Sequence, residues 1–298
     1  MSELPQTKES WEKWITELES TIQLSNDTEQ NYILTLSKKI ENVILTLAKK
    51  STKLGLLFSG GVDSTLIAYI LQKNKIPFIA ISVGFKDDET KFPEDLETSR
   101  IVAKKLNLNY VEEIINSKEA HNLFKETTKI LGKEYSDVVN VGVGSVEVAG
   151  IKKLKEIHCT HIFSGLGSEE LFAGYDRHDK SNDPHQECWN GLKSMFERDL
   201  VRELKITNHF KVEGLIPFLN KELIEYAMTI PAKYKISKDD KKIILRKSAM
   251  RLGLQEEFAQ RPKRAAQYGS RTDKAIAKLT KKHGFKFKKD YLLSLLNV

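Results

Sequence analysis

Three polar side chains and two glycines follow an apolar run near residue 54. The run, residues 54–58, shows no alternation of polar and apolar positions, which is typical of a central strand covered on both faces. It leads into Ser59-Gly60-Gly61-Val62-Asp63-Ser64 and then into an apolar stretch long enough for a buried helix. Adjacent glycines allow a sharp turn that brings backbone N–H groups close to a ligand, and the helix start adds free N–H groups and a positive dipole end. The pattern predicts a phosphate cradle beside which Asp63 can hold a magnesium ion.

This loop differs from the common P-loop because it lacks the four-residue spacer and the Gly-Lys-Ser/Thr ending. The plainer interpretation is a glycine-rich turn without a ligand. The flanking Ser59 and Ser64, the acid Asp63 and the buried strand in front together favour the phosphate-binding interpretation.

A second glycine turn follows about a hundred residues later. The expected strand 161–163 ends in Ser164-Gly165-Leu166-Gly167-Ser168-Glu169-Glu170. In a doubly wound sheet this turn can lie beside the first one, which would bring Glu169 close to the same polyphosphate. A carboxylate there repels phosphate, but together with Asp63 it can hold magnesium that bridges the phosphate oxygens.

The first turn resembles the Ser-Gly-Gly-x-Asp-Ser signature of the ATP pyrophosphatase loop family. The second resembles the Ser-Gly-x-Gly-x-Asp-Glu-x-Phe-x-Gly-Tyr motif of the synthetase domain of asparagine synthetases and of their β-lactam-forming relatives, with Glu169 where that motif has Asp. Three further segments are similar to landmarks of these enzymes, in the same order: 212–220, 242–246 and 261–263. The resemblance covers roughly residues 30–280, and residues 262–270 look closest to the stand-alone archaeal and eukaryotic asparagine-synthetase-like proteins.

The resemblance implies an ATP-dependent, AMP-forming ligase that uses ATP and Mg²⁺, adenylates the β-carboxylate of aspartate and lets ammonia displace AMP. It implies adenosine contacts for Phe58 and Val83, AMP contacts for Ser164 and Gly165, and metal contacts for Asp63 and Glu169. The pyrophosphate would be held by Ser59, Gly60, Gly61, Asp63 and Ser64, and the catalytic residues would be Lys205, Lys263 and Glu170.

Three residues depart from the family pattern. Leu166 stands where the synthetases usually carry an acid implicated in ammonia attack, Leu215 replaces an Arg, and Asn220 replaces an Asp, a nearly neutral exchange at a helix cap. The glutaminase domain with its N-terminal cysteine is also missing from this sequence, in which residue 2 is Ser2. We therefore expect no glutaminase activity of its own, and nitrogen that arrives as free ammonia or from a separate glutaminase partner.

Two other functions stay open beside the asparagine-forming one. An enzyme of the same adenylating type could act on another carboxylate or on RNA, which Leu166 and the basic C-terminal quarter favour. A nucleotide-binding regulator with little turnover would use the same loop.

Alternating strands and helices through residue 163 predict an α/β fold with a doubly wound parallel sheet, and the resemblance implies the adenine nucleotide alpha hydrolase-like arrangement. We expect N-terminal helices in 1–50, a nucleotide-binding core in 51–175, and a mostly helical part in 176–298 without convincing strands. The expected strands are 54–58, 78–83, 110–115 and 161–163, and the expected helices are 11–24, 26–50, 64–73, 93–106, 118–131, 137–157, 186–204, 220–229, 238–252 and 272–282, with a loop at 176–187.

Composition points to a soluble cytoplasmic protein, and the resemblance implies that it acts on small molecules. No apolar run approaches membrane-spanning length, the first thirty residues are polar, and two cysteines do not suggest a disulfide framework. The pairs at 158–161 and 185–188 lack the two matched pairs of a structural zinc site.

The net charge of +7 is uneven, since residues 231–298 hold 19 Lys and Arg against 6 Asp and Glu. Such a basic excess suggests a polyphosphate substrate or nucleic acid, although charge runs are often simply solvated. Residues 281–289 interleave basic and aromatic side chains as nucleic-acid binders do, but we favour a frayed, soluble C-terminus.

Overall fold

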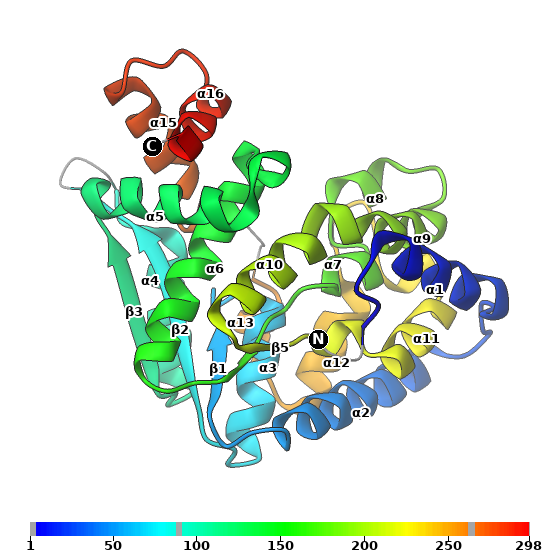
Figure 1. Ribbon diagram of the computed structural model, residues 1–298. Coiled ribbons are helices and arrows are strands. Elements are labelled where there is room, and N and C mark those ends of the chain that lie inside the picture. The colour runs from blue at the N-terminus through cyan, green and yellow to red at the C-terminus, as the bar shows by residue number, and fades with distance from the viewer. Residues whose placement is uncertain (1–3, 88–90, 262–265, 298) are drawn as a thin grey trace.

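Five parallel strands form the centre of the molecule, in the order β3-β2-β1-β4-β5 (Figure 1). The computed structural model describes residues 4–87, 91–261 and 266–297. The strands are β1 (Leu54–Leu57), β2 (Phe78–Phe85), β3 (Tyr110–Ile115), β4 (His161–Phe163) and β5 (Glu213–Leu215). The chain winds outward from β1 to β3, returns to β4 on the other side of β1 and continues to β5, so the predicted doubly wound parallel sheet is confirmed.

Helices cover both faces of the sheet. On one face lie α2 (Glu29–Ala48), α3 (Val62–Lys73) and α4 (Glu94–Lys105); on the other lie α5 (Ser117–Leu131), α6 (Val138–Glu156) and α15 (Thr272–Lys282). The apolar run of β1 is buried because helices pack against both of its sides. The remaining helices are α1 (Lys8–Thr21), α7 (Ser168–Leu171), α8 (Asp176–Lys180), α9 (Pro184–Met195), α10 (Val201–Phe210), α11 (Lys221–Thr229), α12 (Ile243–Leu252), α13 (Glu256–Ala259), α14 (Ala266–Gly269) and α16 (Lys288–Ser294).

Local sequence explains the starts of two helices, α2 and α11. The predicted amphipathic helix from residue 26 is α2, but its N-cap is Thr28, whose hydroxyl accepts a hydrogen bond from Asn31 N at 3.2 Å. Asp27, outside the helix, accepts from the Asn31 side-chain amide, and the helix starts at Glu29 rather than at the predicted residue 26. Asn220 caps α11 by accepting from Leu223 N at 3.3 Å, as expected for an Asp-to-Asn exchange at a cap.

Three expectations for the second half of the chain are wrong. A fifth strand, β5, pairs with β4 where no strand was predicted, because three residues are too few to show a periodic pattern. The region 176–187, predicted as a loop, contains α8 and the start of α9. The C-terminus is not frayed, since α16 packs on α5 and α6 and buries Tyr291 and Leu292.

Among the described residues, no helix combines the length and apolar character that crossing a bilayer requires. In the same part of the chain, no group of three or more His, Cys, Asp or Glu side chains is arranged to hold a metal ion. Cys159 and Cys188 are both buried thiols, whereas His158 is exposed and His161 and His185 are partly exposed, so the histidine–cysteine pairs noted in the sequence combine core and surface residues.

One buried lysine, Lys235, lies outside the sheet and the two glycine turns. Lys235 is 0% exposed, and among the described residues its Nζ has a single contact of hydrogen-bond length, 3.5 Å to Met228 Sδ. Burial lowers the pKa of this amine, and the nearby Cys188 thiol opposes the shift. A thioether is a weak acceptor, so the ammonium form is poorly compensated here.

We expect Lys235→Met to stabilise the fold by roughly 1–3 kcal/mol at neutral pH, because it keeps the chain length and removes a buried amine. The folded-state pKa lies below the usual lysine value of about 10.4. The unfolded chain therefore holds more protons between these two values, and wild-type stability rises with pH across that window. Urea denaturation at about pH 7 and about pH 9.5 should show the advantage of the variant shrinking at the higher pH.

The exposed neighbour Lys233, whose ammonium lies 5.0 Å from the Tyr234 ring centroid, provides the control. Lys233→Met should change stability by less than about 0.5 kcal/mol at either pH. A Lys235→Met variant that is less stable than the wild type would contradict this account of the buried amine.

Candidate active site

The two glycine turns lie side by side at the point where the strand order reverses. β1 pairs in parallel with β4, with Leu56 opposite Phe163, so the turns that follow these strands leave the same edge of the sheet. A Cβ added at Gly165 would lie 3.0 Å from Asp63 Cβ. The second turn can approach the first this closely only because residue 165 has no side chain. Doubly wound sheets bind their ligands at this switch point.

The first turn leads into a helix whose start has no side-chain cap. Gly60 has φ +68°, a conformation that favours glycine, and Gly61 is the N-cap of α3 without a side-chain hydrogen bond to the helix start. Ser64 Oγ accepts from Ser59 N at 3.3 Å, and Ser59 Oγ lies 3.4 Å from Gly61 N, so the two hydroxyls shape the loop itself. A twelve-residue helix that begins without a side-chain cap suits an anion.

Asp63 and Glu169 meet at one buried cation. Lys242 Nζ lies 2.8 Å from both carboxylate oxygens of Asp63, 2.5 Å from Glu169 Oε1 and 3.0 Å from Ser168 Oγ. The side chains are 2% exposed for Lys242, 6% for Glu169 and 14% for Asp63. Burial lowers the pKa of Lys242, while the Asp63 carboxylate opposes that shift. Asp63 and Glu169, the two acids predicted to hold one metal ion, therefore contact the same ammonium group.

Three structural features accompany the position of Lys242. Its backbone has φ +58°, which L-residues rarely adopt, and it immediately precedes α12. A Cβ at Gly174 would collide with Glu169 Oε2 and lie 2.5 Å from Lys242 Cε, so only glycine fits there. The guanidinium of Arg246 donates to the backbone oxygens of Lys241 and Arg261, which ties the start of α12 to the next segment.

Arg261 brings positive charge to the first turn. Its Nη1 donates to Ser59 O at 3.0 Å, and its Nη2 lies 3.8 Å from Asp95 Oδ1 at the start of α4. The same guanidinium lies 3.2 Å from where a Cβ on Gly60 would be. The Arg261 guanidinium therefore lies against the first glycine turn.

Glu170 occupies a different environment from its neighbour Glu169. Its carboxylate is 1% exposed, accepts from Arg198 Nη2 and lies 3.6 Å from Arg177 Nη2. Burial raises the pKa of Glu170, and Arg198 opposes that shift. Both guanidinium groups lie over the Tyr175 ring, 4.2 Å away for Arg177 and 5.5 Å for Arg198. The structure thus places Glu170 in ion pairs that join α7 to Arg177 of α8 and to Arg198, which follows α9.

Arg198 lies on a π-helical turn, Phe196–Leu200, that connects α9 to α10. π-Turns are rare and frequently occur at functional sites. Asp199 on the same turn accepts from Arg198 Nε at 2.7 Å and from Arg202 Nη2 at 3.3 Å, and Arg202 Nε donates to Glu147 at 3.1 Å. This chain of buried charges links the second glycine turn to α6.

The other predicted site residues fall in three places. Phe58 and Val83 are buried in the core on opposite faces of the sheet, 3% and 5% exposed. Lys205 lies on α10 with its ammonium 5.4 Å from the Tyr135 ring centroid. Lys263 lies outside the described residues. The roles assigned to these four residues stay predictions.

Sequence reasoning did not assign roles to Lys242, Ser168 and Arg261. The signal for Lys242 was present, because it opens the Lys-x-x-Leu-Arg segment 242–246. Nothing local indicates that this lysine lies against an acid 179 residues earlier.

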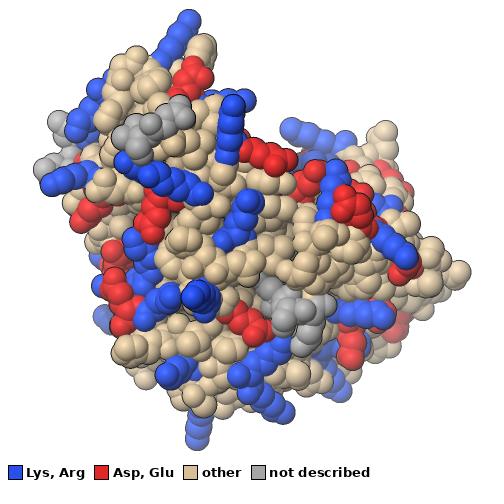
Figure 2. Space-filling model, in the orientation of Figure 1, with Lys and Arg blue, Asp and Glu red and all other residues tan. Residues whose placement is uncertain are grey.

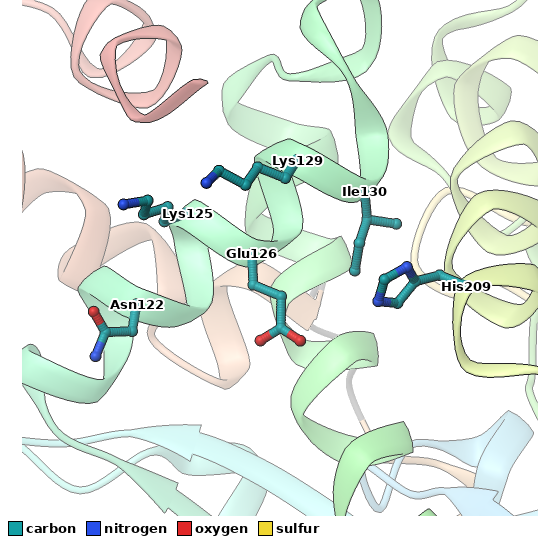
Figure 3. A pocket seen from close by; sticks show the side chains of 6 residues that line it. All are labelled: Asn122, Lys125, Glu126, Lys129, Ile130 and His209. Carbon is teal, nitrogen blue, oxygen red and sulfur yellow. The ribbon is translucent and has the colours of Figure 1, made fainter. Parts of the chain in front are cut away.

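A separate hollow of about 460 Å³ lies between α5 and α10 (Figure 3). It is lined by Asn122, Lys125, Glu126, Lys129, Ile130 and His209. None of these residues belongs to the glycine turns or to the acid–lysine cluster.

The family model for asparagine synthase matches residues 39–187 and 178–284. The chain belongs to the asparagine synthase family. It is 30% identical over 292 residues to a candidate glutamine-hydrolysing asparagine synthetase of Methanocaldococcus jannaschii, an alignment covering 85% of this chain and 52% of that protein. It is 29% identical to the asparagine synthetase of Gallus gallus, over 85% of this chain and 45% of that protein.

The chain therefore spans about half the length of the curated relatives it matches. Among solved structures, the NMN synthetase of Francisella tularensis aligns with a TM-score of 0.43 at 11% identity, covering 91% of this chain and 94% of the other.

We expect Lys242→Met to destabilise the fold by about 3–5 kcal/mol at neutral pH, because two buried carboxylates then face each other without their cation. The triple variant Asp63→Asn, Glu169→Gln, Lys242→Met removes all three charges and should recover most of that loss. Urea denaturation measures both changes in the free energy of unfolding.

Lys241→Met is the matched control. Lys241 pairs with Asp176, whose side chain is 83% exposed, so its loss should cost at most about 1 kcal/mol. Equal losses for Lys241→Met and Lys242→Met would show that the buried cluster does not stabilise the turns.

Proposed function

We propose that this protein is an ATP-dependent, AMP-forming amide ligase of the asparagine synthetase type. The observation that supports this most is the meeting of Asp63 and Glu169 between the two glycine turns. Membership of the asparagine synthase family supports the same reaction class.

The chemistry of the donor set fits magnesium. Asp63 and Glu169 present carboxylate oxygens, the ligands that Mg²⁺ prefers, around a position that already attracts a cation. These two residues would hold Mg²⁺, which would offset the negative charge that develops on the departing pyrophosphate. A divalent ion and the Lys242 ammonium would compete for the same oxygens, so we expect Lys242 to turn toward phosphate when ATP is bound.

The pyrophosphate fits the first turn. The backbone N–H groups of Gly60 and Gly61 and the first turn of α3 form the cradle, and Lys242 and Arg261 supply positive charge beside it. Ser164 and Gly165, at the end of β4, adjoin the cradle at the position proposed for AMP. A carboxylate oxygen of the acceptor would attack the α-phosphorus, the α–β phosphoanhydride bond would break, and pyrophosphate would leave.

Ammonia would then attack the acyl carbon of the adenylate, and AMP would leave with the bonding electrons of the acyl–oxygen bond. Aspartate is the proposed acceptor, with asparagine, AMP and pyrophosphate as products. The nitrogen is proposed to arrive as ammonia, either free or from a separate glutaminase.

Leu166 favours a second candidate, a ligase for another carboxylate. Its side chain packs beside the apolar core and its N–H lies 3.3 Å from Ser164 Oγ. Leucine can neither accept a proton from the nitrogen of attacking ammonia nor hold an ammonium ion by charge. Leu215, where the synthetases carry Arg, is 1% exposed in β5 and likewise offers no charge to an acceptor carboxylate.

The test is pyrophosphate release by purified protein with ATP, magnesium, aspartate and ammonium, compared with the same mixture without aspartate. Asp63→Asn and Glu169→Gln should each lower the rate by about 100-fold or more, because each removes a charge beside the phosphates. Glu126→Gln alters a surface carboxylate of α5 that pairs with Lys152 of α6, and it should leave the rate unchanged.

If pyrophosphate release requires a carboxylate other than aspartate, the result excludes the asparagine-forming ligase and supports the ligase for another carboxylate. Calorimetric binding of ATP without turnover across a panel of acids would overturn both and indicate a nucleotide-binding regulator.

A further inference from the structure

The C-terminal helices form a fixed surface on the α5 side of the molecule (Figure 1). Tyr291 and Leu292 of α16 are 0% exposed, and the Phe285 ring lies 5.9 Å from the Tyr291 ring. The loop between α15 and α16 is therefore anchored on both sides.

The last residues of α15, this loop and the first residues of α16 are together strongly basic, and residues 281–289 are called the basic loop below. Between residues 281 and 290 the sequence has five lysines and one aspartate: Lys281, Lys282, Lys286, Lys288, Lys289 and Asp290. Within the described chain, none of these lysines pairs with a carboxylate, whereas Lys278, one turn earlier, pairs with Asp87 at 3.0 Å. Figure 2 shows blue side chains gathered over the end of the molecule that α5, α15 and α16 form.

α5 adds the charge of Lys125 to the positive surface and places the ring of His121 beside it. His121 stacks on His283 of the loop with ring centroids 4.8 Å apart, and its Nδ1 lies 2.9 Å from the Tyr291 hydroxyl. Burial lowers the pKa of His121, and His283, Lys125 and Lys282 lower it further. Every charged group that shifts the pKa of His121 is thus positively charged. Lys125 also lines the adjoining hollow, and Figure 3 shows its ammonium reaching outward from α5.

An exposed aromatic ring lies within this basic surface. Phe287 is 58% exposed, which is unusual for so apolar a side chain, and the Lys286 ammonium lies 5.3 Å from its ring centroid. Proteins that bind single strands combine lysines along the phosphodiester backbone with aromatic rings on which bases stack. A duplex or a lipid headgroup would use the lysines but offers no unstacked base to the ring.

We propose that the basic loop 281–289, together with Lys125 and His121 of α5, binds single-stranded nucleic acid, with Phe287 as the stacking residue. The proposal is independent of the ligase reaction, because none of these residues belongs to the glycine turns.

Binding is tested by fluorescence anisotropy of the whole protein with labelled single-stranded RNA and DNA of about 12 nucleotides. The triple variant Lys282→Glu, Lys286→Glu, Lys289→Glu should weaken binding at least about tenfold, and Phe287→Ala about 5- to 150-fold. The wild-type affinity should fall steeply between about 50 and 200 mM salt, and less steeply in the triple variant.

The matched control reverses three exposed lysines around α2 and the start of β1, Lys38→Glu, Lys49→Glu and Lys53→Glu, and should leave affinity within about twofold of wild type. Thermal melting checks that each variant is folded. RNA and DNA arms distinguish the two sources of single strands, and binding of either supports the proposal.

Four results would overturn it: no binding at low salt, equal weakening by the control variant, Phe287→Ala binding as wild type, or equally tight binding of duplex DNA. Preferential binding to phosphatidylserine vesicles would assign the surface to a membrane instead.

Discussion

The contact of the Lys242 ammonium with Asp63 and Glu169 is the interaction on which the rest of the site depends. Two carboxylates in a largely buried space repel each other strongly, so they can lie this close only around a cation. The lysine thus joins the two glycine turns, because its ammonium contacts an acid from each of them. The same charge arrangement serves stability and the proposed phosphate chemistry.

Several features of the chain follow from that constraint. Gly165 and Gly174 leave room where a Cβ would collide with Asp63 or Glu169, and Arg246 holds the backbone from which Lys242 projects. On the far side of the second turn, Glu170 turns away from the cluster and pairs with Arg198 of the π-helical turn. Adjacent acids in the sequence therefore perform different tasks, since one faces the proposed metal position and the other joins helices.

The strands and helices of the first half of the chain could be predicted because each is apolar or amphipathic over several residues. β3, β4 and α15 have the predicted bounds. β5 could not be predicted, because a three-residue strand owes its conformation to pairing with β4 rather than to its own pattern. The C-terminal helix α16 was missed for a related reason: its few apolar residues become informative only when α5 and α6 are present to cover them.

The sequence by itself determined that two strand–glycine–helix turns exist, that each carries acids, and that the chain resembles asparagine synthetases, because these are properties of neighbouring residues. Only the tertiary structure decided which side chains meet. Lys242, 179 positions from Asp63, became the partner of both acids, whereas Glu170, next to Glu169, was directed elsewhere. The order of strands around β1 brings the turns together, and strand order depends on packing across the whole sheet, which no local pattern records.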